Sequence, residues 1–277
     1  HREMLGGPQV NTAIIDIERT ALEALHENIP EGIRLSLGIS KKNIGAGFAS
    51  IVSALPSSAI VLNRTIGVGH GTPESKETIA EIVEAYQEAG VERYFIHIHP
   101  DAEPREIGEW LIEKGLERTR SWQKFCRGQE AVAPISTDLS IRKINANAGN
   151  DLASILCDAF DLGDEARPWI ALLPNFPGWH VFMAYDGDTA AGTGAVFIDG
   201  ETAWMDFGAT SPQFRRRGSQ SSLLRHRVQF ALERGCTRMF TCTGEAVPGD
   251  PQHSYSNIQK AGFVEDYVRA NYAPPKK

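Results

Sequence analysis

The feature that most constrains this sequence is a basic, glycine-containing turn between an apolar segment and a helical one. The turn reads TSPQFRRRGSQ and spans Thr210–Gln220, with Ala203–Gly208 before it and Ser221–Arg234 after it. The first turn of a helix leaves backbone N–H groups unpaired and carries the positive end of the macrodipole, so a phosphate placed there gains from both. Gly218 has no Cβ and lets the backbone approach a ligand closely. The order therefore predicts a site for a phosphate-bearing ligand; a surface turn with solvated arginines is the alternative.

The segment after the turn has the period of a helix packed on a sheet. Its apolar residues recur at helical spacing and a glycine follows as a stop: Leu224, Val228, Ala231, Leu232 and Gly235. The turn is neither a Walker A motif nor G-x-G-x-x-G, so residue chemistry alone does not identify the ligand.

The pattern T-x-P-x-x-R-x-x-G-x-Q over Thr210–Gln220 resembles motif A of the Gcn5-related N-acetyltransferases, the GNAT superfamily, whose usual form is V-x-P-x-x-R/Q-x-x-G-x-G/A. Asn257–Phe263, reading NIQKAGF, is similar to the later helix of that family, which ends in Gly-Phe. The resemblance extends over Asp138–Tyr272. Gln220 departs from it, because a small residue is usual at that position.

The sequence also indicates an internal duplication. Ala85–Ile98 and Phe230–Thr243 can be aligned. The alignment pairs Glu88, Gly90, Arg93 and Phe95 with Glu233, Gly235, Arg238 and Phe240. A period this long indicates duplicated domains rather than a solenoid. With Gly128–Asp138 as linker, we predict two α/β (α+β) GNAT-like domains, residues 1–130 and 131–277, each a mixed, strongly bent sheet flanked by helices.

Hydrophobic periodicity predicts the elements of both halves. The first half has predicted helices at Thr12–Asn28, from Thr72-Pro73 to Gly90, and at Pro104–Lys114, and predicted strands at Ile33–Ile39, Gly45–Leu55, Ser58–Gly69, Tyr94–Ile98 and Glu117–Cys126. The second half has predicted strands at Leu139–Ile144, Trp179–Tyr185, Ala190–Ile198 and Thr202–Thr210, and predicted helices at Asp151–Phe160, Ala166–Leu173 and Ser221–Arg234.

The alignment also predicts which copy binds the anion. Gly218 and Ser219 fall on Pro73 and Glu74, where proline removes a backbone donor and glutamate adds a negative charge. We expect the first copy not to bind a cofactor, and to act structurally or to cover the acceptor side of the second copy.

The resemblance implies acetyl-CoA as co-substrate and direct attack by a primary amine of a small molecule or peptide, as an acyl-CoA-dependent N-acyltransferase. The turn would hold the pyrophosphate, and the strand before it would pair with the pantetheine arm. The implied cofactor-binding residues are Gly208, Ala209, Thr210, Arg215, Arg216, Arg217, Gly218, Ser219, Gln220, Ser221, Ser254 and Asn257.

The family often uses a tyrosine four residues before the glycine of Gly-Phe as general acid, and Ile258 occupies that position here. Tyr255 is the first candidate to replace it, with Tyr267 on the next strand as the second; an ordinary packing role is the alternative for Tyr255. Asp206 is the candidate general base. The alternative is that it is a carboxylate on a strand without a chemical role. The missing tyrosine leaves open a second function, a CoA-binding sensor or partner-binding module without turnover.

Composition limits the other classes. The net charge of −7 argues against nucleic-acid binding, and together with the lack of neighbouring aromatic residues it argues against an RNA-binding or phosphoprotein-binding role for the RRRG turn. The apolar runs are too short for a membrane span, the N-terminal HREMLGG has no apolar leader pattern, and the four cysteines form no C-x-x-C pair, so a cytoplasmic monomer or homodimer is expected. His97 and His99 share a strand face but have no evident third ligand, so no metal is expected.

Overall fold

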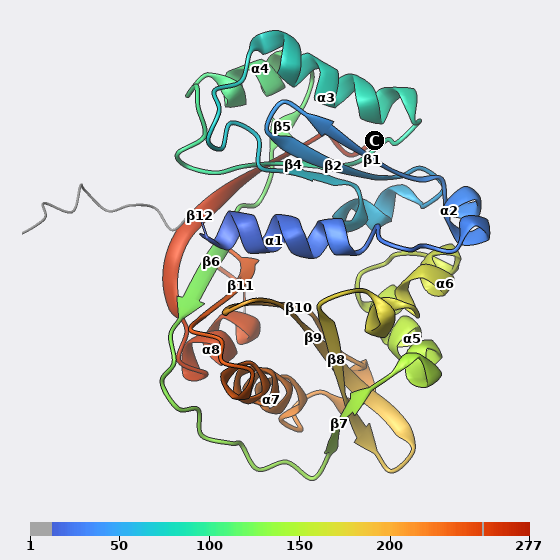
Figure 1. Ribbon diagram of the computed structural model, residues 1–277, viewed down its shortest axis with the longest axis vertical. Helices are drawn as coiled ribbons and strands as arrows, with labels where there is room; N and C mark the ends of the chain where they lie inside the picture. Colours follow the sequence, from blue (N-terminus) through green and yellow to red (C-terminus); the bar gives the residue numbers. More distant parts are fainter. Residues whose placement is uncertain (1–12, 251) are drawn as a thin grey trace, which may run out of the picture.

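A computed structural model describes residues 13–250 and 252–277, which form an α+β structure around one curved sheet with helices on its faces (Figure 1). The helices are α1 (Ala13–Ala24), α2 (Glu31–Leu37), α3 (Lys76–Glu88), α4 (Ile107–Glu113), α5 (Gly149–Ala159), α6 (Arg167–Ile170), α7 (Ser219–Glu233) and α8 (His253–Lys260). The strands are β1 (Ile39–Ile44), β2 (Gly47–Val52), β3 (Arg64–Ile66), β4 (Phe95–Ile98), β5 (Glu117–Arg118), β6 (Trp122–Arg127), β7 (Ser140–Ile144), β8 (Trp179–Asp186), β9 (Thr189–Asp199), β10 (Thr202–Thr210), β11 (Arg238–Gly244) and β12 (Val264–Ala273).

The two halves repeat one topology, as the alignment predicted. In the first, β1, β2 and β3 are antiparallel neighbours, and α3 connects β3 to the parallel strand β4. In the second, β8, β9 and β10 are antiparallel neighbours, and α7 connects β10 to the parallel strand β11. The helices α3 and α7 end at Glu88 and Glu233, which the alignment pairs. The tandem arrangement of a mixed, bent sheet is thus confirmed.

The halves exchange strands, which the sequence did not predict. The sheet order is β1-β2-β3-β4-β12-β6-β11-β10-β9-β8-β7. Strand β6 belongs to the first half by sequence, yet it lies between β11 and β12 of the second. The end of β12 pairs in turn with β4, placing Ala270 opposite Ile98 and Tyr272 opposite Ile96. Figure 1 shows β12 running along one side of the molecule from one half to the other. The boundary after residue 130 remains a prediction, and the sheet is continuous across it.

Two strand predictions in the first half are wrong. Residues 33–39 were expected to be a strand because apolar residues alternate, but Glu31–Leu37 is the helix α2. It follows Pro30, and Gly38 ends it in the left-handed region at φ +60. Within residues 58–69, a 3₁₀ helix covers Ser57–Leu62 and only β3 is extended. β-branched residues there pack as helical turns, because tertiary context overrides strand propensity.

Several predicted boundaries also shift. Helix α3 begins at Lys76 rather than at Thr72-Pro73, because the Ser75 hydroxyl accepts a hydrogen bond from the Thr78 N–H and caps it. The predicted strand over residues 117–126 is divided into β5 and β6. Thr12, the first residue of the predicted first helix, and the N-terminal HREMLGG segment lie outside the described residues.

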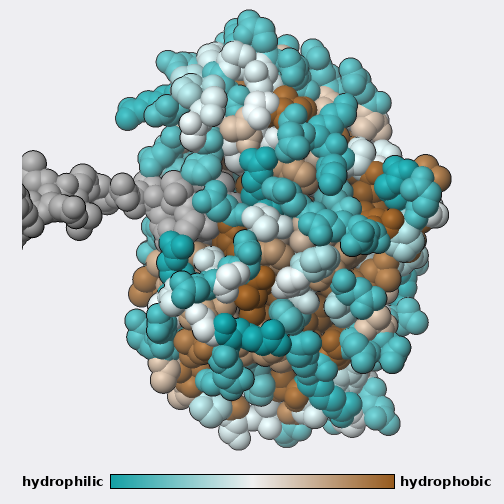
Figure 2. Space-filling model, viewed as in Figure 1, coloured by the Kyte–Doolittle hydropathy of each residue, from teal (hydrophilic) through white to brown (hydrophobic). Residues whose placement is uncertain are grey.

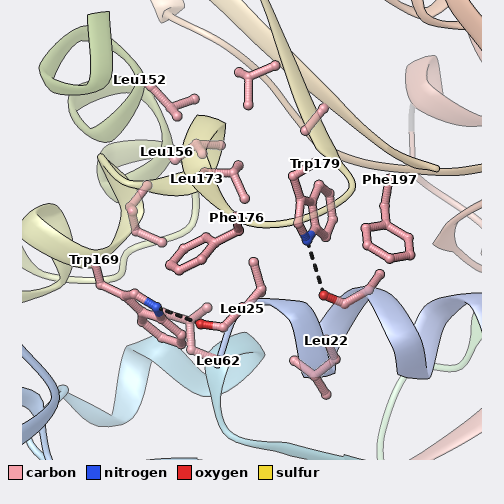
Figure 3. Close-up of a cluster of buried hydrophobic side chains, with 14 of the residues drawn as sticks. Leu22, Leu25, Leu62, Leu152, Leu156, Trp169, Leu173, Phe176, Trp179 and Phe197 are labelled. Carbon is pink, nitrogen blue, oxygen red and sulfur yellow. Dashed lines mark hydrogen bonds between the residues drawn. The ribbon is translucent and has the colours of Figure 1, made fainter. Parts of the chain in front are cut away.

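Helix α1 lies between the two halves and is anchored by two tryptophans of the second half. Trp169 Nε1 donates to the Leu25 carbonyl and Trp179 Nε1 to the Ala21 carbonyl, each at 3.1 Å (Figure 3). Both indoles are nearly fully buried. Leu22 and Leu25 pack against the same apolar cluster. Because a buried indole satisfies its N–H only through such a partner, these bonds fix the position of α1 over the second half.

Candidate functional site

The basic turn has the geometry of an anion site. Strand β10 ends at Thr210, a 3₁₀ turn covers Pro212–Phe214, and α7 starts at Ser219. Gly218 precedes the helix in the left-handed region at φ +78, and among the described residues no side chain caps the first turn. The N–H groups at this helix start are therefore available to an anionic ligand.

The three arginines of the turn have different surroundings. The Arg217 guanidinium lies 2.6 Å from Asp138 Oδ2 and 2.9 Å from Asp186 Oδ2. Thr137 also donates to the Arg217 carbonyl at 2.8 Å. Arg217 therefore ties the turn to the linker and to β8, whereas Arg215 and Arg216 are exposed. The charge presented to a ligand comes mainly from these two residues.

Gln220, the departure from the family pattern, has a structural role. Its Nε2 donates to the Ala209 carbonyl at 2.8 Å and to Thr210 Oγ1 at 3.0 Å. The side chain thus connects the start of α7 to the end of β10. Nearby, Ser221 Oγ donates to Asn257 Oδ1 at 3.0 Å and joins α7 to α8. These bonds bring residues of three elements around one end of β10.

Strand β10 carries a bulge. Its register against β9 shifts between Asp206 and Ala209, and Phe207 has φ +54, which is uncommon for a bulky residue. Asp206 Oδ1 accepts from the Phe207 N–H at 2.7 Å, and its Oδ2 accepts from Trp204 Nε1 at 3.0 Å. Both carboxylate oxygens therefore support the bulge, which frees β10 from regular pairing at Gly208.

A buried arginine supports the same bulge. Arg227 on α7 donates from Nη1 to the carbonyls of Ala195 and Asp206 at 3.0 and 3.2 Å, and from Nε to the Leu223 carbonyl. Burial lowers its pKa to about 10. Arg227 is not among the site residues predicted from the sequence, although it lies one position before Val228 on the helix. A charged residue beside the apolar stripe of a packed helix was the available signal.

Beyond their first residues β10 and β11 separate, and a cavity opens between them. The two strands pair only over residues 202–204 and 238–240. The cavity has a volume of about 360 Å³. It is lined from α1 and the first half by Glu18, Leu22 and Arg64, from the second half by Trp204, Asp206, Gly208, Gln220, Cys242, Ser254, Asn257 and Ile258, and by Trp122 of the exchanged strand β6. Figure 2 shows apolar residues gathered below the level of α1 and surrounded by hydrophilic ones.

The candidate catalytic residues do not all face this cavity. Asp206 lines it. Tyr255 is not among the lining residues; its hydroxyl donates to the Glu265 carboxylate, and burial and then this carboxylate raise its pKa to about 12. Tyr267 is not among the lining residues either; it is buried against the ring of His99, and its hydroxyl has no hydrogen-bond partner among the described residues. Burial raises the pKa of Tyr267 well above its ordinary value.

A buried charge cluster, which is also absent from the sequence predictions, forms one wall of the cavity. The Glu18 carboxylate is fully buried and bonded to three cations: Arg64 at 2.9 Å, Lys124 at 2.9 Å and Arg269 at 2.7 Å. Burial alone would raise the pKa of Glu18, but the three cations hold it well below its usual range. Glu18 lies four residues after Ile14 and three before Ala21, a charge within an apolar stripe, and this was the available signal.

In the first half, a carboxylate occupies the position that corresponds to the anion site. Glu74 is buried, and its Oε1 accepts from the N–H groups of Ala46 at 2.8 Å and Gly69 at 3.2 Å. Gly69 follows β3 as the basic turn follows β10. A carboxylate of the chain itself therefore already binds the Gly69 N–H of this loop.

The described residues contain no group of three or more potential metal ligands. His97 Nδ1 is paired with Asn271 Oδ1 at 2.7 Å, which engages one ring nitrogen. None of the described helices is long and apolar enough to cross a membrane.

Comparison with known proteins adds a family to this geometry. Residues 150–250, which include the bulged strand, the basic turn and α7, match the sequence model of the Acetyltransferase (GNAT) family. These residues form a GNAT domain. No curated protein sequence matches the chain significantly.

Solved structures extend the fold similarity beyond the GNAT domain to the whole chain. A GCN5-related N-acetyltransferase from Kribbella flavida is 14% identical, covers 96% of each chain and has a TM-score of 0.64. One from Sphaerobacter thermophilus is 14% identical over 94% of this chain and 90% of the other, with a TM-score of 0.56. A tandem GNAT protein from the clavulanic acid biosynthesis pathway is 11% identical over 96% and 97%, with a TM-score of 0.54. At these sequence identities the similarity shows the fold alone. The tandem GNAT structure supports the interpretation that the two halves are tandem copies of one fold.

Proposed function

We propose that the protein transfers an acetyl group from acetyl-CoA to a primary amine, which attacks the thioester directly. The observation that carries this proposal is the uncapped start of α7 behind Gly218, next to a bulged strand that opens onto a cavity. The pyrophosphate would lie on the N–H groups from Arg215 to Ser221, with Arg215 and Arg216 adding positive charge.

The pantetheine arm would extend from this turn along Gly208, Ala209 and Thr210 of β10, on the edge of the strand that faces away from β9, as an added strand would. Ser254 and Asn257 on α8 would contact the arm from the other side, because both line the cavity. The acyl carbonyl would lie near the bulge. A backbone N–H there would stabilise the negative charge that develops on its oxygen.

The amine would enter from the side of the cavity that α1 and the first half form. Attack on the thioester carbon forms the C–N bond and expels the CoA thiolate, while the amine loses a proton. Asp206 is the proposed acceptor of the proton that the amine loses, because it lines the cavity. Tyr267 or Tyr255 is the proposed donor of a proton to the CoA thiolate. Since the thiol of CoA has a pKa of about 8.5, its thiolate can also leave without a dedicated general acid.

The test is release of free thiol from acetyl-CoA in the presence of a panel of primary amines, with the acetylated amine identified by mass spectrometry. Calorimetry should give one acetyl-CoA site per chain, because Glu74 occupies the corresponding loop of the first half. Two equivalent sites would contradict the asymmetry of the halves.

A CoA-binding module without turnover is the second candidate. It is favoured by Ile258 at the family's tyrosine position and by the Tyr255 hydroxyl, which is engaged with Glu265. Saturable binding of acetyl-CoA with no acetylated product from any amine would support this candidate over the enzyme.

A further inference from the structure

The wall of the cavity formed by the first half and β6 carries more positive than negative charge. Arg64, Lys124 and Arg269 surround one carboxylate, that of Glu18. All four side chains are nearly or fully buried. His97, next to the cluster, adds no compensating anion, and burial followed by repulsion from Arg269 and Arg64 holds its pKa well below the usual value. Within the described residues, the salt bridges therefore leave the cations in excess.

Buried donors in this cluster also lack partners. Arg269 is 2% exposed, and its Nε and Nη2 have no hydrogen-bond partner among the described residues. The same is true of His99 Nε2, which carries the ring proton because Nδ1 accepts from the Asp101 N–H. Buried N–H groups left without acceptors destabilise a folded protein, and buried charges are normally paired. The cluster thus has both the charge and the free donors to accept an anion.

The cluster is continuous with the cavity. Glu18 and Arg64 both line it. Trp122, a third lining residue, packs under the other two cations, with Arg269 Cζ at 5.1 Å and Lys124 Nζ at 5.6 Å from the ring centroid. The phosphates of acetyl-CoA would bind at the start of α7, which follows the C-terminal end of β10. The excess charge therefore belongs to the acceptor side of the cavity.

We propose that the acceptor is an amine that also carries a carboxylate, and that Arg64 binds this carboxylate from the wall of the cavity. An arginine fork matches carboxylate geometry through paired N–H donors. Glu18 holds Arg64 through Nη1, while Arg269 and Lys124 behind Glu18 supply long-range attraction in a low-dielectric interior. The inference rests on the proposed acetyltransferase function and narrows its substrate class to amino acids and related amino carboxylates.

The first experiment uses the wild-type protein and matched amines. Initial rates of thiol release from acetyl-CoA are compared for glycine and glycinamide, 4-aminobutyrate and 4-aminobutanamide, and L-phenylalanine and L-phenylalaninamide. At least one carboxylate should exceed its amide in kcat/KM by about ten-fold or more, as charged hydrogen bonds imply. Equal or higher rates with all the amides would overturn the carboxylate proposal and leave the acetyltransferase proposal standing. No product from any amine would instead contradict the acetyltransferase proposal.

The second experiment removes the proposed carboxylate ligand. Arg64→Gln should raise KM for the preferred amino carboxylate by about ten-fold or more, with acetyl-CoA affinity unchanged. Arg64→Lys should recover part of the loss, and Arg93→Gln, at a half-buried arginine outside the cavity lining, should have no effect. If Arg64→Gln does not fold, butyrate should still inhibit the wild type competitively against the amine and not against acetyl-CoA. Butyrate that competes with acetyl-CoA, or an unchanged KM in a folded variant, would overturn the proposal.

Discussion

At the residue scale, Gly218 determines whether the basic turn can receive a ligand. Its φ of +78 lies in the left-handed region, while a Cβ at this position would meet Thr137 only at ordinary contact distance, 3.8 Å. Backbone conformation rather than crowding within the protein therefore requires glycine here. The turn places the N–H groups of α7 where a pyrophosphate would bind.

Replacement of Gly218 should therefore weaken the binding of acetyl-CoA. Gly218→Val strains the turn and moves those N–H groups, so we expect acetyl-CoA affinity to fall by about ten-fold or more in calorimetry. Gly200→Val is the matched control, because Gly200 has φ +55 in the β9–β10 hairpin with no atom near its Cβ position. Gly200→Val should lower the stability of the protein without changing its affinity for acetyl-CoA. Unchanged affinity in folded Gly218→Val would refute the pyrophosphate assignment.

The two tyrosines can be separated by removal of a single hydroxyl. Tyr267→Phe should lower kcat, because this hydroxyl is buried and has no competing partner among the described residues. The loss should be smaller than the ~10²–10⁴-fold typical of acid–base groups, since a thiolate leaves readily. Tyr255→Phe should change kcat less, because its hydroxyl is engaged with Glu265. The kcat values of the two variants, measured at saturating acetyl-CoA, decide which tyrosine donates the proton. A larger loss in Tyr255→Phe than in Tyr267→Phe would favour Tyr255.

At the element scale, the exchange of β6 and β12 joins the two halves more firmly than the linker does. The linker between β6 and β7 connects the halves without pairing to any strand of the described residues, whereas β6 is hydrogen-bonded to β11 on one side and to β12 on the other. Neither half has a complete sheet by itself: without β12, β4 has an open edge, and without β6, β11 and β12 have no common neighbour.

Cleavage of the linker should therefore leave the protein assembled. A specific protease site inserted near residues 131–134 should allow a cut after which the two fragments still elute together and retain acetyl-CoA binding. Residues 131–277 expressed alone should aggregate or remain unfolded by circular dichroism. A soluble, folded C-terminal fragment with undiminished affinity would contradict a structural requirement for β6.

Strand β6 also illustrates which parts of the fold can be predicted from the sequence and which cannot. Strands β8, β9 and β10 and helix α7 were predicted because their periodicity and hairpin turns are local signals. The exchange of β6 was not, because its partners lie over a hundred residues along the chain, and no local pattern encodes pairing at that distance. In the site, the turn residues followed from a contiguous motif. Arg64, Lys124 and Arg269 did not, since Glu18 joins them only in the folded molecule.

At the scale of the whole molecule, buried and half-buried histidines make stability depend on pH. Burial lowers the pKa of His26, His99 and His180 to about 4. In the unfolded chain a histidine has a pKa of about 6.5, so below that pH unfolding takes up protons. The free energy of unfolding should thus be highest above about pH 6.5 and fall as the pH drops towards 4.

Urea titrations at pH 8, 6.5 and 5 would measure this loss. His26→Gln should reduce the loss between pH 6.5 and 5, because His26 packs between Phe48 and Trp169 and bonds Ser50 Oγ at 2.7 Å. His253→Gln, at an exposed position, should not. Constant stability from pH 8 to 5 would contradict neutral burial of these rings.

The exchanged strands also have a consequence for synthesis on the ribosome. Strand β6 is made long before β11 and β12, between which it finally lies, and the edge of β4 stays unpaired until residues 270–272 have been made. The first half therefore emerges with an unpaired strand and an open sheet edge that stay exposed until β11 and β12 have been made. Segments of this kind attract chaperones and promote aggregation. We expect nascent chains stalled before residue 264 to bind chaperones and to be digested readily by protease, whereas released chains resist both.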